Sequence, residues 1–281
     1  CVNSIISKNQ STTTEIIIVN NNSKEKNTYL FLDKFILSSS PNRFHRVINS
    51  PGPFNFSKLN NSAARIASGN VFLLLNNDIQ FISDSWEVDL VTNALRPDIG
   101  CVGAKLLYKD HSIQHGGVIL GIGGVAGYSH KYFMCDDLGY ANRINISQEL
   151  MALTGACLAI KKSNWELLKG LDEENFSVNY NDVDLCLRAS AIGLRNIYLP
   201  HIHAFHLESA TRGFHPKGLK YLQWKKEFKK MRELWSKILD DDPYYNPNLT
   251  NQYEDFSLGF RYHQFNARKA PYLTLKNKSH Y

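Results

Sequence analysis

The side chains best suited to chemistry gather in residues 153–213. An apolar run of strand length (156–160) is followed by a helical pattern, then by a loop rich in carboxylates that leads to Asp182 and Asp184. A second helical pattern comes next, and the segment ends in a stretch with three histidines and an arginine. Carboxylates, a histidine and an arginine joined by short connections are what the metal-assisted transfer of a phosphate-bearing group requires. We expect this segment to supply part of such a site, with the rest coming from elsewhere.

A second polar cluster follows the strongest predicted strand. Residues 71–75 (VFLLL) are continuously apolar, which is typical of a strand buried on both faces, and residues 76–78 (Asn-Asn-Asp) come directly after it. The carboxyl end of such a strand is where α/β sheets bind ligands, and an aspartate there is well placed to hold a divalent cation against a diphosphate. Residues 15–19 (EIIIV), followed by the polar residues 20–23, repeat the pattern. At both places an ordinary turn is the alternative.

The hydrophobic periodicity predicts an α/β fold. We expect strands at residues 15–19, 43–48, 71–75, 101–107 and 156–160, and helices at 57–68, 84–95, 219–239 and from an N-cap at Asn181 or Asp182 to near Gly193. The apolar face of helix 219–239 is expected to pack on the domain. Residues 116–127 are rich in glycine but lack the spacing of a dinucleotide fingerprint. They are predicted to form a flexible loop beside the substrate, or else a plain turn-rich connection, and residues 131–146 a mobile loop.

Composition narrows the class of protein. The five cysteines are odd in number and lack CxxC spacing, which argues against a disulfide framework or a zinc site and for a reducing compartment; Cys157 and Cys186 are expected in the core. No apolar run approaches the length of a membrane span.

The net charge of +6 is accounted for by residues 217–237, which hold eight Lys or Arg and two Glu. That helix face is either simply solvated or contacts an acidic membrane surface; no nucleic-acid partner is expected.

Several segments together carry a family resemblance: EIIIVNNNS, FNFSKLNNSAARIASGNVFLLLNND, IQHGGVILGIGGVAG, LTGACLAIKKSNWELLKGLDEENF, YNDVDLCLRASAIG and HLESATRG. In this order and spacing they resemble a family 2 glycosyltransferase with the GT-A fold, of the bacterial O-antigen or capsular polysaccharide type. The resemblance implies a mixed, mostly parallel sheet flanked by helices over residues 1–215, with a basic amphipathic helix and irregular tail over 216–281. It also suggests a fragment that lacks the family's first strand, because residues 1–10 look like the second half of a helix.

The resemblance also implies roles for individual residues. Asp182 matches the catalytic base, Asp78 the principal metal ligand, and His206 a histidine that completes the metal site, whereas His201 and His203 are interpreted as surface or core residues. Donor-binding positions carried over are Asn20, Asn22, Ser23, Asn61, Arg65, Asn76, Asn77 and Arg212; acceptor or sugar positions are Thr154, Gly155 and Asp184, although a structural role is preferred for Asp184. Asn20 and Asn76 stand where the family usually has aspartates.

The implied activity is inverting transfer of a rhamnose or hexose from a dTDP- or UDP-sugar, with Mn²⁺ or Mg²⁺, to a glycan or lipid-linked acceptor. A cytoplasmic location with peripheral contact at the inner membrane would suit such acceptors. Two alternatives stay open on the residues alone. One is a sugar nucleotidyltransferase, and the other is a non-catalytic module that binds glycan or a partner enzyme.

Overall fold

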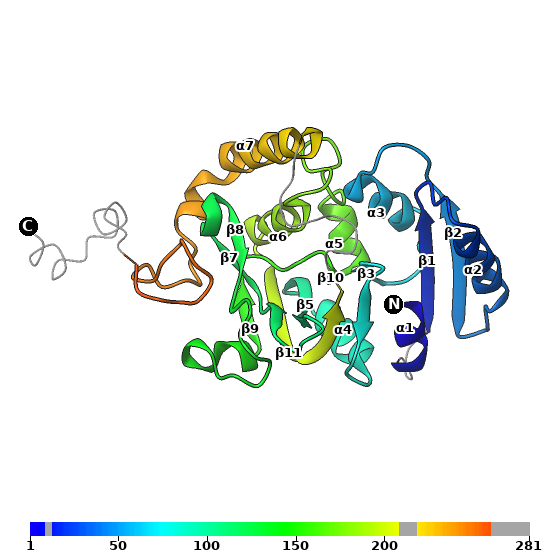
Figure 1. Cartoon of the computed structure of the whole chain (residues 1–281), viewed down its shortest axis with the longest axis horizontal. Helices are drawn as coiled ribbons and strands as arrows, with labels where there is room; N and C mark the ends of the chain where they lie inside the picture. Colours follow the sequence, from blue (N-terminus) through cyan, green and yellow to red (C-terminus); the bar gives the residue numbers. More distant parts are fainter. Residues whose placement is uncertain (9–12, 208–217, 260–281) are drawn as a thin grey trace, which may run out of the picture.

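The structure is a computed structural model, and it describes residues 1–8, 13–207 and 218–259 (Figure 1). The predicted donor residue Arg212 lies outside the described residues. The helices are α1 (Val2–Lys8), α2 (Lys26–Leu37), α3 (Phe56–Ala64), α4 (Trp86–Ala94), α5 (Lys162–Leu167), α6 (Asn181–Ala191) and α7 (Leu219–Asp240), with 3₁₀ turns η1 (Ile122–Gly124) and η2 (Tyr140–Asn145). The strands are β1 (Thr14–Asn20), β2 (Arg43–Asn49), β3 (Val71–Leu75), β4 (Ile79–Phe81), β5 (Ile99–Leu107), β6 (Ile113–His115), β7 (Val118–Leu120), β8 (Ala126–Tyr128), β9 (Gln148–Leu150), β10 (Cys157–Lys161) and β11 (Arg195–His206).

Seven strands form the main sheet, in the order β3-β10-β5-β11-β4, with β6 paired to β5 and β9 to β11. The expected α/β fold with a mixed sheet is confirmed. Its ladders are more often antiparallel than expected, since within this sheet only β5 and β11 pair in parallel. Strand β5 is buried along its whole length, as a central strand covered on both faces should be.

Alternation along the central strands divides the core into two layers. In β10, Leu158 and Ile160 join one apolar cluster while Cys157 and Ala159 join the other, because successive side chains of a strand point to opposite faces. The first cluster is covered by α5, α6 and α7, and the second by α1 and α4. The predicted core positions of the thiols Cys157 and Cys186 are confirmed by their burial.

Strands β1 and β2 form a separate two-stranded parallel sheet, which lies beside β3 in Figure 1. The strand prediction for residues 15–19 is confirmed, but the expectation that they are buried on both faces is wrong: Thr14 to Val19 are only half-buried. The reason is topological, because β1 has a ladder with β2 alone among the described strands, and a two-stranded unit covers little surface. The apolar composition could not show how many neighbours the strand would have.

The glycine-rich stretch differs from its prediction as a flexible loop. Strands β7 and β8 pair as an antiparallel hairpin around η1, and β6 joins the main sheet. Glycines permit this compactness: at Gly117, with φ +101°, an added Cβ would lie 2.2 Å from a methyl carbon of Leu150. Residues 131–146, expected to be a mobile loop, instead contain η2 and the fully buried Ile144.

Helix boundaries are mostly as predicted, with two informative differences. Helix α3 ends at Ala64 rather than near Ser68. Helix α6 starts after Tyr180, which occupies the N-cap position with a left-handed φ of 61°, so the expected side-chain cap from Asn181 or Asp182 is wrong. The carboxylate of Asp182 is used elsewhere, as described below. No helix among the described residues has the length and apolarity needed to cross a lipid bilayer.

Candidate functional site

The predicted base, Asp182, stands in the first turn of α6 with its carboxylate held by backbone donors. The amide of Gly155 donates to Oδ2 at 2.7 Å and the amide of Val183 donates to Oδ1 at 2.9 Å. The close packing of Gly155 against Asp182 favours glycine, since a Cβ at position 155 would lie 3.2 Å from the Asp182 Cβ. The residue is half-buried, and the two amides fix the orientation of its carboxylate.

The predicted metal ligands Asp78 and His206 do come together. Nε2 of His206 lies 3.3 Å from Oδ1 of Asp78 and 3.3 Å from Nδ2 of Asn76. Asp78 and Asn76 follow β3, and His206 is the last residue of β11. The pairing of β4 with the end of β11, Ile79 opposite His206, brings the two chain segments together. His206 is almost fully buried, and its Nδ1 has no hydrogen-bond partner among the described residues.

These residues fit a cation site with few protein ligands. Among the described residues, no group of three or more His, Cys, Asp or Glu side chains could hold a metal ion. One carboxylate and one imidazole are nevertheless suitable ligands for Mn²⁺, which accepts oxygen and nitrogen donors. A cation at Asp78 and His206 would need its remaining ligands from a diphosphate and water, which is how cations of substrate phosphates are commonly bound.

The segment 154–156 contacts both the predicted base Asp182 and the start of the turn that carries the predicted metal ligand Asp78. The backbone amide of Gly155 donates to Asp182. The carbonyl of Ala156, one residue later, accepts the backbone amide of Asn76 at 3.0 Å. This contact continues the β3–β10 ladder, in which Leu75 is paired with Cys157. Asp182 and Asn76, which are distant along the chain, are therefore both hydrogen-bonded to the backbone of residues 155–156.

Thr154, predicted to line the acceptor or sugar, is a buried residue at the start of this segment. Its hydroxyl lies 3.1 Å from the Tyr128 hydroxyl and accepts the Ala156 amide at 3.3 Å, and its own amide donates to Nε2 of His115 at 3.3 Å. Burial lowers the pKa of His115 to about 4, so its ring is neutral and Nε2 is available as an acceptor. Thr154 thus supports the turn before β10.

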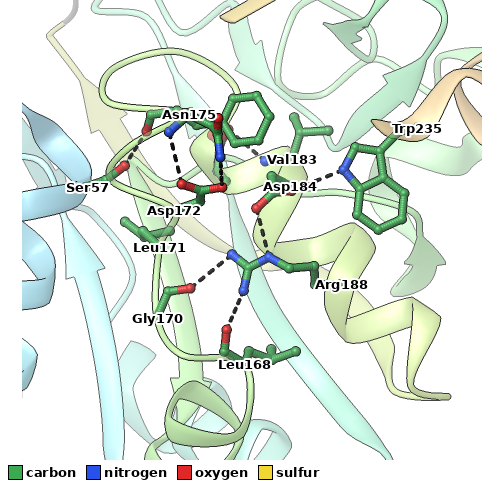
Figure 2. A network of polar contacts seen from close by, with 12 residues as sticks. Ser57, Leu168, Gly170, Leu171, Asp172, Asn175, Val183, Asp184, Arg188 and Trp235 are labelled. Carbon is green, nitrogen blue, oxygen red and sulfur yellow. Dashed lines mark hydrogen bonds and ion pairs between the residues drawn. The ribbon is translucent and has the colours of Figure 1, made fainter. Parts of the chain in front are cut away.

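Asp184 is enclosed by side chains of α6 and α7 (Figure 2). Its carboxylate accepts Nε of Arg188 at 2.8 Å and Nε1 of Trp235, from α7, at 3.0 Å. Arg188 also donates to the backbone carbonyls of Leu168 and Gly170, at 2.5 and 2.9 Å. The Asp184 side chain is 3% exposed, and burial raises its pKa although Arg188 and Trp235 oppose the shift. We assign this carboxylate a structural role and no substrate contact.

The remaining predicted donor residues lie on other elements. Asn20, at the end of β1, donates to Asn49 and accepts the Ser23 amide, and Asn22 donates to the Gly52 carbonyl. On α3, Asn61 exchanges hydrogen bonds with the backbone of Leu171, whereas Arg65, just after the helix, donates to Ser62. None of these contacts reaches Asp78 or Asp182, and Asn77 lies in the turn after β3.

Sequence reasoning missed several residues that hold the site. Arg188 was recognisable, because an arginine four residues after Asp184 on one helix is a standard ion-pair spacing. Glu227 could have been recognised from its spacing. It lies three residues after Trp224 and four before Met231, which places this carboxylate on the apolar face of α7 that is expected to be buried. It is 2% exposed. His115 and Tyr128 carried no signal in the sequence.

Comparison with known proteins adds to this geometry. Residues 1–163, more than half of the 281 residues, match the family described as "Glycosyl transferase family 2". The chain is 40% identical over 213 residues to "Uncharacterized protein y4gI" of Sinorhizobium fredii, with 76% of this chain and 23% of that protein covered. It is 34% identical over 226 residues to "O-antigen biosynthesis protein RfbC" of Myxococcus xanthus, with 79% of this chain and 17% of that protein covered. The chain thus spans less than a quarter of the length of these curated relatives.

Solved structures agree on the fold. The structure of GalNAc-T7 with UDP, GalNAc and Mn²⁺ is similar, with a TM-score of 0.67, 15% identity, and 85% of this chain and 45% of that chain covered. The mannosyltransferase PcManGT of Pyrobaculum calidifontis, in complex with GDP-Man and Mn²⁺, is similar with a TM-score of 0.54 and 14% identity. The match covers 81% of this chain and 58% of that chain. At these identities the likeness shows the fold alone, which is that of GT-A glycosyltransferases. Together with the family match, it shows that this chain belongs to glycosyl transferase family 2.

Proposed function

We propose that this chain is the transfer module of an inverting, metal-dependent glycosyltransferase that moves a hexose or deoxyhexose from a nucleoside diphosphate to a glycan or lipid-linked acceptor. The observation that carries the proposal is the connection between Asp182 and the pair Asp78–His206 through residues 154–156. It joins an oriented carboxylate and a cation-binding pair, which are the two chemical parts that such a transfer needs.

Each part has a task set by the bonds that change. In a single displacement the acceptor hydroxyl attacks the anomeric carbon as the bond to the nucleoside diphosphate breaks. Asp182 would accept the hydroxyl proton, and the amides of Gly155 and Val183 hold its carboxylate in place for that transfer. Asp78 and His206 would hold the divalent cation, which supplies positive charge to the departing diphosphate.

The donor and the metal are supported by similarity. The two solved structures with this fold contain UDP or GDP-mannose together with Mn²⁺, and the RfbC relative is named for O-antigen biosynthesis. We therefore propose a role in bacterial surface polysaccharide synthesis, with Mn²⁺ or Mg²⁺ as cation. The proposed donor, a UDP- or dTDP-sugar, is the one that the family resemblance implies. Asn20, Asn22, Ser23, Asn76 and Asn77 are proposed on the donor side, since they follow the carboxyl ends of β1 and β3.

Lipid-linked acceptors would place the protein at the cytoplasmic face of the inner membrane. In support, α7 directs lysines away from the body of the molecule: Lys225, Lys226 and Lys229 are exposed. Lys229 and Lys230 each lie 3.7 Å from Glu233, whose single negative charge offsets only one of the two lysines, so the face keeps a net positive charge. Anionic headgroups are the complementary partner for such a face.

The proposal is tested by Asp182→Asn, which keeps the shape of the side chain and removes its basicity. Nucleotide release should be measured with UDP-, dTDP- and GDP-sugars, Mn²⁺ and candidate acceptors, alongside calorimetric donor binding. Because a positioned base contributes about 10²–10⁴-fold, we expect a loss of that size with donor affinity unchanged within about twofold. Asp89→Asn, on an exposed aspartate of α4, is the control and should retain activity.

Two results would count against the proposal. Retained turnover in Asp182→Asn would remove this residue as the base. Failure of the folded wild-type chain to bind any of these donors with Mn²⁺ would favour a non-catalytic module that binds glycan or a partner enzyme.

A further inference from the structure

Glu227 of helix α7 lies 48 to 50 positions after residues 177–179, which precede Asp182, yet its buried carboxylate joins the two segments. Glu227 lies in the middle of α7 and is 2% exposed. Its Oε1 accepts the backbone amides of Ser177 and Val178 at 2.9 and 3.1 Å, together with the Ser177 hydroxyl at 2.7 Å. Its Oε2 accepts the amide and the side-chain amide of Asn179 at 2.9 and 2.6 Å.

Such a contact is specific to the loop conformation. Three consecutive backbone N–H groups converge on one carboxylate, which requires a curled backbone at residues 177–179. Burying a carboxylate is costly unless hydrogen bonds replace its hydration, and here five donors from the loop do so. The lowest-energy arrangement of the loop is therefore tied to the presence of the negative charge on Glu227.

The same helix holds the segment at two further points. Nε1 of Trp224 donates to the Tyr180 hydroxyl at 2.9 Å, and Nε1 of Trp235 donates to Asp184 at 3.0 Å. Tyr180 is the left-handed residue from which α6 begins. The α7 contacts thus lie just before Asp182 and two residues after it, so that both sides of the proposed base are fixed from one helix.

The opposite side of the loop rests on α3. The amide of Ser57 donates to the Ser177 carbonyl at 3.3 Å, and its hydroxyl donates to the carbonyl of Phe176 (Figure 2). Ser57 is fully buried. The loop is therefore held between α3 and α7. Ser57 contacts it with neutral groups, whereas Glu227 on α7 contacts it with a charge that can be removed without changing the shape of the side chain.

We propose that Glu227 is a positioning residue for the transfer reaction: it sets the loop 177–179 and through it the place of Asp182, without touching substrate. This inference rests on the proposed role of Asp182 as the base. It assigns to α7 a part in the chemistry in addition to its part in packing. The amide of Gly155 fixes one side of the Asp182 carboxylate, and Glu227 fixes the backbone that carries it.

The test is Glu227→Gln, which keeps the size of the side chain. It replaces one acceptor oxygen by an NH₂ group that faces N–H donors. We expect kcat to fall about tenfold or more, while the donor Kd, measured by calorimetry with UDP-sugar and Mn²⁺, stays within about twofold. Glu227→Asp retains the charge and should recover part of kcat. Glu233→Gln, on the exposed face of the same helix, is the matched control and should keep the wild-type kcat.

The outcomes separate this inference from the proposed function. If Glu227→Gln lowers only the unfolding midpoint, and its folded fraction turns over at the wild-type rate, Glu227 is structural and the inference is wrong. If Asp182→Asn is inactive while Glu227→Gln is fully active, the function stands and only the positioning role fails. If Asp182→Asn is active, the base assignment fails, and with it the premise of this inference. Should Glu227→Gln not fold, the kcat of Glu227→Asp decides, and an unchanged kcat overturns the positioning role.

Discussion

At the scale of single residues, two aspartates on one turn of α6 have been given opposite environments. Asp182 is half-buried and oriented by two backbone amides, whereas Asp184 is enclosed by Arg188 and Trp235. The proposed base must reach the hydroxyl whose proton it accepts, and Asp182 is the more exposed of the two, since Asp184 is 2% exposed. Neighbouring carboxylates with different surroundings can in this way serve different tasks.

A pH dependence of stability follows from the buried His130. Burial, assisted by Arg143 and Lys105, lowers its pKa from 6.5 to about 3. Between these values the unfolded chain binds a proton that the folded chain does not, so stability falls as the pH is lowered from 6.5 towards 3. We expect this residue alone to cost about 2 kcal/mol of unfolding free energy by about pH 5.

Urea unfolding at a series of pH values tests the contribution of His130. His130→Gln should have a lower stability at neutral pH, because the ring accepts the Tyr140 amide and bonds Ser129, but a shallower loss on acidification. His201→Gln, on a half-exposed ring, should keep the wild-type slope. An unchanged slope in His130→Gln would contradict the prediction.

At the scale of elements, α7 has two faces with different roles. Its inner face inserts Met231 and Leu239 into the main core and carries Glu227. Its outer face carries the lysines. Helical periodicity separates the two, since residues at three- and four-residue spacing share a face. The predicted packing of its apolar stripe on the domain is confirmed for Met231, although Tyr221 at the start of the helix is 44% exposed.

The outer face leads to a prediction about vesicles. Replacing Lys225, Lys226, Lys229 and Lys230 by Gln should weaken sedimentation with anionic phospholipid vesicles by at least about tenfold, because each lysine near such a surface contributes about 1 kcal/mol. The control replaces Lys24, Lys26, Lys34 and Lys58, which are exposed on α2, α3 and the loop before α2, and makes the same change in net charge. Equal binding by the two variants would show that α7 is not a specific membrane-contacting face.

At the scale of the whole molecule, the sheet of β1 and β2 is separate from the seven-stranded main sheet. The main sheet has β5 at its centre with both faces covered, while β1 and β2 are paired only with each other among the described strands. A two-stranded unit with half-exposed side chains has little apolar burial to offset the loss of chain entropy. We therefore expect the proposed donor residues Asn20, Asn22 and Ser23 to lie on the less stable part of the fold.

Hydrogen exchange measured by mass spectrometry should reveal this division. Amides of Thr14–Asn20 and Arg43–Asn49 should exchange at least about a hundredfold faster than those of Ile99–Leu107, since small units open with lower free energy than the central strands. The two sheets are compared within one sample, so global stability cancels. Equal protection of β1 and β5 would show that the two sheets open as one unit.

The sequence by itself determined the elements and their chemical candidates. Continuous apolar runs located β3, β10 and β5 to within a residue or two, and the polar residues after β3 identified Asp78, because hydrophobic patterning and strand ends are local properties of the chain. Asp78 and His206, predicted as metal ligands, lie 3.3 Å apart, and their role stays a prediction. It came from a family resemblance, which carries three-dimensional information that patterning lacks.

Only the tertiary structure decided which polar groups share an environment. The contacts of Glu227 with residues 48 to 50 positions earlier depend on how α7 packs, and the different fates of Asp182 and Asp184 depend on neighbours from α7 and the turn before β10. The glycine-rich stretch formed a hairpin because its backbone found partners, which glycine content cannot reveal. Burial and hydrogen-bond partners are non-local quantities, and they are fixed by packing between segments that the sequence lists far apart.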